Sequence, residues 1–228
     1  MENLADYFQR RPIHLAILIA NLSAIIILLI RRDNSKPLRI FLFYLLISFA
    51  TNLLTDILSS VRVNNIIYNN AWVLLSTIFT MFFFREVFLD THIKKYILFG
   101  VYAYTLIFLA DFFGSNPELP NLHEHKFVLY SLPLRSFVIL VLCLIFYFEL
   151  MKELYIEKLT SSAIFWIVSA LFLYHAGSMF ITAIFQSQYR WHSTEFYRTI
   201  SRIPLYFEFI SLGVVSIGLL RSKKYLIG

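Results

Sequence analysis

Seven long apolar stretches, separated by short segments rich in charged residues or turn formers, dominate the amino-acid sequence. A helix needs about 20 mostly apolar residues to cross a hydrocarbon layer about 30 Å thick. The sequence therefore predicts an all-α, polytopic membrane protein. We expect seven membrane-spanning helices at about residues 13–30, 38–60, 66–88, 96–113, 127–150, 163–185 and 200–220.

Little of the chain lies outside these stretches. The longest loops, near residues 114–126 and 186–199, are too short to fold as separate domains, so residues 1–228 are expected to form a single seven-helix domain. The composition agrees, because the chain is 59% hydrophobic with a mean hydropathy of +0.69, more apolar than soluble domains are. Strands of a membrane barrel would alternate apolar and polar residues, whereas residues 24–30 and 82–84 are apolar on every side.

The positive charge of the chain fits a membrane better than a nucleic acid. The formal net charge is +6, but the basic residues gather mainly at the ends of the apolar stretches. Anionic lipid headgroups and the rule that sets helix orientation explain this placement. We therefore expect the lipid bilayer as a partner and no nucleic acid. The single cysteine, Cys143, excludes an internal disulfide.

The lysines predict an orientation. Seven of the eight fall in segments on one side of the predicted bundle, at Lys36, Lys94, Lys95, Lys152, Lys158, Lys223 and Lys224. Loops that face the cytoplasm carry an excess of basic residues. The pattern predicts a multi-pass membrane protein with the N-terminus outside and the C-terminus in the cytoplasm.

Polar residues inside the apolar stretches are the candidates for a binding site, because they are costly in a membrane and usually face the interior of the bundle. Five of them fall at a similar depth, about 12–15 Å below the outer surface at a rise of 1.5 Å per residue. We expect them to line an outward-facing polar cavity that binds a small polar or anionic ligand. These residues are Asn21, Asn52, Arg135, His175 and Glu208. Arg135 would recognise charge, since a guanidinium group matches a carboxylate or phosphate.

Structural roles are the alternative for the same residues. Helical spacing places Ser48, Asn52, Thr55, Asp56 and Ser59 on one face of the second predicted helix. Such polar stripes commonly join membrane helices through hydrogen bonds. Arg135 and Glu208 would then neutralise each other as an ion pair, His175 would be a hydrogen-bonded packing residue, and Asp56 would pair with Arg62.

No motif of a metal site, cofactor site or catalytic centre stands out. His123-Glu124-His125 has two imidazoles and a carboxylate close together, but no third strong ligand is placed near them. The helices carry no His pair with the spacing of a zinc hydrolase. We therefore expect no metal, no cofactor and no enzymatic activity.

Several short segments carry a resemblance to a known group of proteins. These are residues 65–69, Phe165-Trp166-Ile167 with Leu173-Tyr174 and Gly177, and the end of the last helix at Arg221-Ser222-Lys223-Lys224. The chain resembles uncharacterised seven-helix inner-membrane proteins from bacteria of the Bacteroidetes type. That resemblance implies an inner-membrane bundle, in some cases similar to the membrane sensor portion of histidine kinases. Since this chain has no kinase domain, a separate cytoplasmic partner would have to carry the signal.

Three functional hypotheses follow. The favoured one is a sensor or receptor-like module without enzymatic activity, which binds its ligand in the polar cavity. The second is a small solute transporter in which Glu208 and His175 relay protons. The third is a membrane-embedded enzyme.

Overall fold

The structure is a computed structural model, and it describes residues 4–33, 35–118, 124–152, 156–187 and 202–222, with the backbone alone for 156–158 and 182–187. The described chain is helical, without strands. Its elements are α1 (Leu4–Arg10), α2 (Pro12–Arg31), α3 (Lys36–Ser60), α4 (Ile66–Val87), α5 (Thr91–Ser115), α6 (Ser131–Lys152), the 3-10 helix η2 (Ile156–Ser161), α7 (Ala163–Ser187) and α9 (Ile203–Arg221). Within these residues, seven helices are long and apolar enough to cross a membrane, so the predicted fold class is confirmed.

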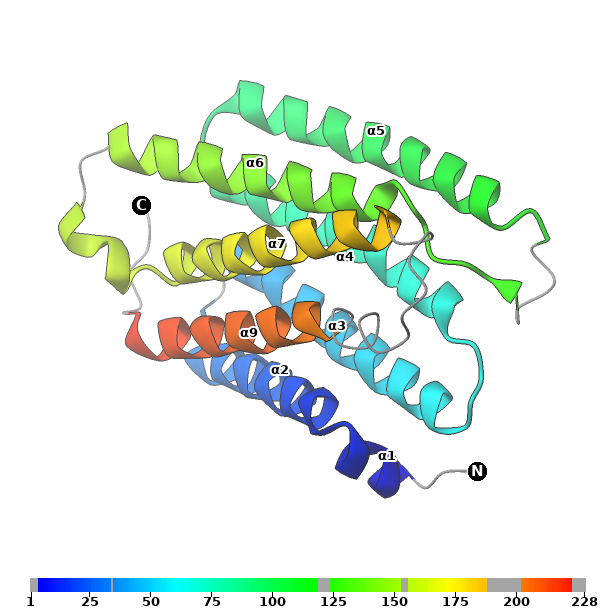
Figure 1. The fold of residues 1–228 in the computed structure, drawn as a ribbon. Helices are drawn as coiled ribbons and strands as arrows, with labels where there is room; N and C mark the ends of the chain where they lie inside the picture. Colours follow the sequence, from blue (N-terminus) through cyan, green and yellow to red (C-terminus); the bar gives the residue numbers. More distant parts are fainter. Residues whose placement is uncertain (1–3, 34, 119–123, 153–155, 188–201, 223–228) are drawn as a thin grey trace.

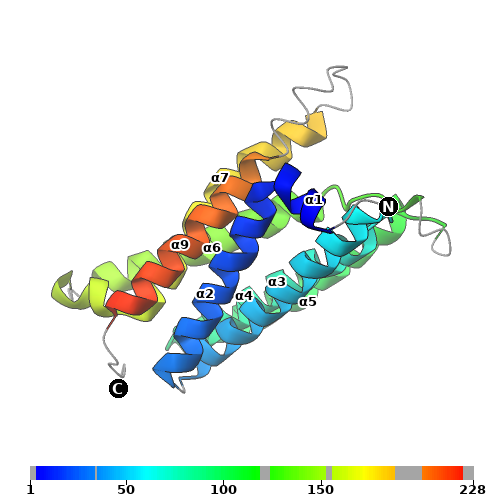
Figure 2. The same ribbon diagram turned by 90° about the horizontal axis from the view of Figure 1, so that it is seen from below.

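Six of the spanning helices form a closed ring, in the order α2, α3, α4, α6, α7 and α9 (Figure 1). The contact between α9 and α2 closes the ring, and α5 lies outside it against α4 and α6. Successive spans run in opposite directions. We call the end of the bundle that carries α1 the N-terminal end, and the end where α9 finishes the C-terminal end (Figure 2).

The outer surface of the bundle is apolar, as a lipid bilayer requires. Large side chains such as Ile30, Phe99, Phe180 and Leu220 are each at least 70% exposed. In water, contiguous apolar patches of this kind are rare on a monomer. The exposed side chains and the length of the spans together indicate an integral membrane protein.

Two helix boundaries differ from the sequence prediction by four residues or more. Helix α5 begins at Thr91 rather than near residue 96, because the Asp90 side chain caps it by accepting a hydrogen bond from the backbone N–H of His92 at 2.6 Å. Helix α6 begins at Ser131 rather than near 127, because the segment before it is held in a non-helical form by side chains of other helices.

Three buried polar residues hold that segment. The carboxylate of Asp111, on α5, accepts hydrogen bonds from the backbone N–H groups of Tyr130 and Ser131 and from the Ser131 hydroxyl, each at 2.8 Å. These are unpaired donors of the first turn of α6, where a negative charge is also favoured by the helix dipole. The amides of Asn70 and Asn116 bind the backbone of Lys126 from α4 and from the end of α5.

Helix α1 was not expected from the sequence. Pro12 begins α2 and separates it from α1, which packs against the start of α2 and the last turns of α3. Its buried side chain Tyr7 donates a hydrogen bond to Asp56 of α3 at 3.1 Å. Burial, followed by the negative charge of Asp56, raises the pKa of Tyr7 above its usual value of 10.0.

Asp56 also meets His14 of α2, whose Nδ1 lies 2.8 Å from the same carboxylate oxygen. The carboxylate thus joins α1, α2 and α3 at the N-terminal end of the bundle. Its partners in the described chain are Tyr7 and His14, and the expected pairing with Arg62 is wrong.

Candidate ligand-binding cleft

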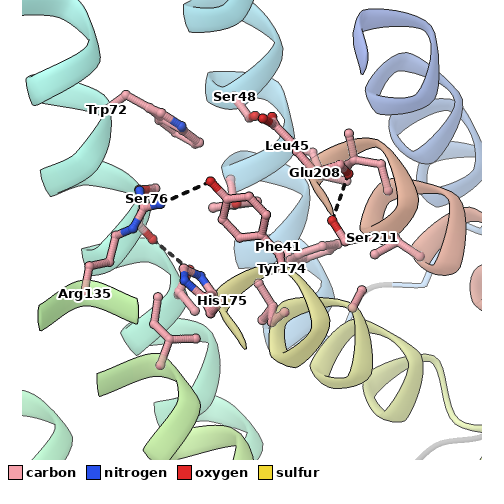
Figure 3. A pocket seen from close by; sticks show the side chains of 17 residues that line it. Phe41, Leu45, Ser48, Trp72, Ser76, Arg135, Tyr174, His175, Glu208 and Ser211 are labelled. Carbon is pink, nitrogen blue, oxygen red and sulfur yellow. Dashed lines mark hydrogen bonds between the residues drawn. The ribbon is translucent and has the colours of Figure 1, made fainter. Parts of the chain in front are cut away.

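A cleft of about 580 Å³, counting the part that opens to the outside, lies inside the ring of helices (Figure 3). Five helices contribute to its walls. The lining residues are Phe41, Tyr44, Leu45, Ser48, Trp72, Ser76, Thr80, Arg135, Ile139, Ala170, Leu171, Tyr174, His175, Glu208, Ser211, Leu212 and Val215. Ser48, Ser76, His175 and Leu212 lie at or next to the midpoints of α3, α4, α7 and α9. The cleft is therefore near the middle of these spans.

Arg135 is the cation of the cleft, and its side chain is 94% buried. One turn into α6, it reaches toward α4 and α7. Nη1 donates to the Ser76 hydroxyl at 3.1 Å and Nη2 to the Tyr174 hydroxyl at 3.2 Å, while Nε has no hydrogen-bond partner. Both partners are neutral. Among the described residues no carboxylate lies within ion-pair distance, so the structure leaves this buried charge uncompensated.

Glu208 is the anion of the cleft, and it comes from α9. Figure 3 shows it on the opposite side from Arg135, with the ring of Tyr174 between them. The amide Nδ2 of Asn52 donates to Oε1 of Glu208 at 3.1 Å, and no other donor of the described chain reaches the carboxylate. The Ser211 hydroxyl binds the backbone carbonyl of Glu208 instead. The expected ion pair between Arg135 and Glu208 is absent from the described part of the molecule.

His175 forms part of the wall between these two charges. The side chain is 98% buried, and its Nδ1 lies 3.2 Å from the Ser136 hydroxyl of α6. Its ring meets that of Tyr174 edge-on, with 4.8 Å between the ring centroids. The imidazole thus joins α6 to α7 and borders the cleft at the same time.

The five residues singled out in the sequence are partly brought together. Arg135, His175 and Glu208 line one cleft, and Asn52 is bonded directly to Glu208. Asn21 is farther from the cleft, where its fully buried amide contacts the Ser48 hydroxyl at 3.1 Å and joins α2 to α3. Asn21 therefore has the helix-joining role typical of polar residues in membrane bundles.

Sequence reasoning missed the aromatic residues of the cleft. Tyr44 and Trp72 face each other from α3 and α4, with ring centroids 5.3 Å apart, and Tyr174 supports Arg135 from α7. Tyrosine and tryptophan are common at membrane interfaces, so their presence in apolar stretches does not by itself indicate a site. The spacing between Tyr44 and Ser48, one helical turn, was the available signal, because it places Tyr44 on the polar face of α3.

The described residues contain no group of three or more His, Cys, Asp or Glu side chains arranged to hold a metal ion. His123, part of the motif considered above, lies outside the described residues. Comparison of the chain with protein-family models, with curated proteins and with solved structures finds no match.

Proposed function

We propose that this integral membrane protein is a sensor or receptor-like module, without enzymatic activity, that binds a small anionic ligand in the cleft at Arg135. One observation carries the proposal. A buried guanidinium group lines an open cleft, and its hydrogen-bond partners in the described chain are two neutral hydroxyl groups.

The energetics favour an anion beside Arg135. A charge taken out of water without a counter-charge is costly, and buried charges in proteins are normally paired. A guanidinium group has five N–H donors, and Ser76 and Tyr174 use two of them. The remaining donors include Nε–H, which forms part of the planar fork that binds a carboxylate or phosphate through two hydrogen bonds.

Binding of simple anions to the purified protein tests this proposal. Acetate, butanoate and inorganic phosphate are titrated into protein in lipid nanodiscs, and stabilisation is followed by labelling of Cys143 with a maleimide dye. Cys143 is the only cysteine of the chain and is fully buried, so the dye reports unfolding. At least one of these anions should raise the melting temperature of the unaltered protein.

Arg135→Gln should abolish that response, whereas Arg39→Gln, at an exposed position of α3, should retain it. Gln keeps N–H donors but is shorter and carries no charge, so the comparison tests the guanidinium group as a whole. A response that is the same in Arg135→Gln would overturn the assignment of the anion to this residue. If the unaltered protein responds to none of these anions and binds no other compound that carries a carboxylate, the proposed function is overturned.

A transporter is the second candidate, and the depth of the cleft favours it. Binding sites of many transporters lie near the middle of the membrane, between groups of helices. Here the cleft lies at the midpoints of four spans, with Glu208 and His175 on its wall as candidate proton carriers. Uptake of butanoate into proteoliposomes, driven by a proton gradient and lost in Glu208→Gln, would establish transport in place of sensing.

The same proposal includes the type of membrane and the orientation of the chain across it. The resemblance of the sequence to bacterial inner-membrane proteins supports the cell inner membrane. The lysine distribution supports an N-terminal end outside and a C-terminal end in the cytoplasm, where a signalling partner would bind. Alkaline phosphatase and a fluorescent protein fused after Gly228 test the orientation. We expect fluorescence without phosphatase activity, and the opposite result would reverse the topology.

A further inference from the structure

We infer that the ligand of the cleft is a zwitterion, with its carboxylate at Arg135 and its ammonium group at Glu208, as in an amino acid. The inference rests on the proposed function, because it assigns a ligand class to the same site. It goes further by giving Glu208 a defined role as the second point of recognition.

The charges of the cleft carry the first step. Arg135 and Glu208 line the same space from α6 and α9 but do not pair, and each is held in place by neutral groups. A simple anion bound at Arg135 would share the cleft with the negative charge of Glu208. A ligand that carries both charges compensates both residues and avoids this repulsion.

The hydrogen bonds carry the second step. Oε1 of Glu208 accepts from Asn52, and the rest of the carboxylate has no donor from the described chain. An ammonium group has three donors and no acceptor, so it suits a carboxylate that lacks partners. The free Nε–H of Arg135 is the corresponding group for the carboxylate of the ligand.

The aromatic residues carry the third step. Tyr44 and Trp72 form a tilted pair on the wall of the cleft, and Phe41 stacks on Tyr44 with ring planes 12° apart. Aromatic faces attract an ammonium group and also accept an apolar skeleton. The cleft therefore suits a zwitterion with an aliphatic or aromatic skeleton better than a highly polar one such as a sugar phosphate.

Two matched sets of probes test the inference on the unaltered protein in nanodiscs. One set is 4-aminobutanoate, butanoate and butylamine, and the other is phenylalanine, 3-phenylpropanoate and 2-phenylethylamine. Within a set the skeleton is constant and one charge is removed at a time. In at least one set the zwitterion should bind at least about tenfold more tightly than either analogue, since hydrogen bonds to charged groups are the strong ones.

The outcomes separate this inference from the proposed function. If in both sets the carboxylate without an ammonium group binds as tightly as the zwitterion, the zwitterion is refuted while the anion site stands. If only the amines bind, both proposals fail. If none of the six probes binds, the zwitterion is refuted, and the phosphate titration described above then decides the anion site by itself.

Variants assign the two ends of the ligand. Glu208→Gln should remove the difference between zwitterion and simple carboxylate, whereas Arg135→Gln should abolish binding of both. Glu149→Gln, on α6 and paired with Lys152 away from the cleft, is the matched control and should behave as the unaltered protein. A Glu208→Gln protein that still prefers the zwitterion would overturn the assignment, and the probe series decides the ligand class even if a variant does not fold.

Discussion

Replacing Gly218 with alanine should push helices α7 and α9 apart. A Cβ atom built on Gly218 would overlap Cβ and Cγ of Trp166 on the facing helix. The Cβ of Trp166 is fixed to its own backbone, so no side-chain rotation relieves the contact. Small residues allow membrane helices to approach closely, and this pair of helices depends on that approach.

Gly213 of the same helix is the matched control, because a Cβ there meets nothing within 4 Å. Alanine favours a helix over glycine by about 1 kcal/mol, and this gain is common to the two variants. The difference between them therefore isolates the overlap, for which the usual cost of overpacking is about 1–3 kcal/mol. At about 2–4 °C per kcal/mol for a chain of this size, Gly218→Ala should melt about 2–12 °C below Gly213→Ala.

Gly177 provides an intermediate case. A Cβ there would meet the ring of Phe207 at 2.5 Å, but an aromatic ring can turn away where a Cβ cannot. Labelling of Cys143 during a thermal ramp measures all three variants, with Gly213→Ala expected to be the most stable and Gly218→Ala the least. Equal melting temperatures for Gly213→Ala and Gly218→Ala would refute the reasoning, since the close approach of α7 and α9 would then be unnecessary.

Three further substitutions test the polar contacts that order the bundle, each read by labelling of Cys143 during a thermal ramp. Asp111→Ala should lower the free energy of unfolding by about 2–4 kcal/mol, because it leaves the first N–H groups of α6 without an acceptor. Asp111→Asn should lower it less, because the amide keeps one acceptor oxygen. Equal losses for the two variants would exclude the capping role. Arg31→Ala should lower the free energy of unfolding by about 1–3 kcal/mol, since Nη1 of Arg31 donates to backbone carbonyls at the end of α9. Arg39→Ala, at an exposed position, should have little effect. Tyr7→Phe should lower the free energy of unfolding by about 0.5–1.5 kcal/mol, because it removes the hydrogen bond to Asp56. Since the pKa of Tyr7 is raised in the folded state, the contact is fully present below pH 10 and is lost as the pH rises further, so the variant should also show a smaller loss of stability above pH 10 than the unaltered protein.

The sequence by itself determined the class of fold and most of the helix boundaries. Apolar stretches of membrane-crossing length can satisfy their backbone hydrogen bonds only as helices, so length and composition are sufficient. The start of α5 was displaced by a local cap, Asp90, whereas the start of α6 was displaced because side chains from other helices decide it. Asp111 shows this best, because it lies on α5 and yet sets the first residue of α6.

The polar stripe of α3 was also readable, since it follows from helical spacing, but its partners were not. Ser48 meets Asn21, Asn52 meets Glu208, and Asp56 meets His14 of α2. Which residue faces which depends on the order of helices around the ring and on their rotation about their own axes. Neither is encoded in the hydropathy of one helix.

Only the tertiary structure decided whether Arg135 and Glu208 neutralise each other or remain apart. The sequence predicts similar depths in the membrane for the two residues, so it allowed an ion pair as readily as a binding site. The ring places α6 and α9 on different sides of a cleft, and Tyr174 of α7 lies between the two charges (Figure 3). Two opposite charges at similar depth form a pair or remain apart according to the helix that separates them, and that separation is a property of packing.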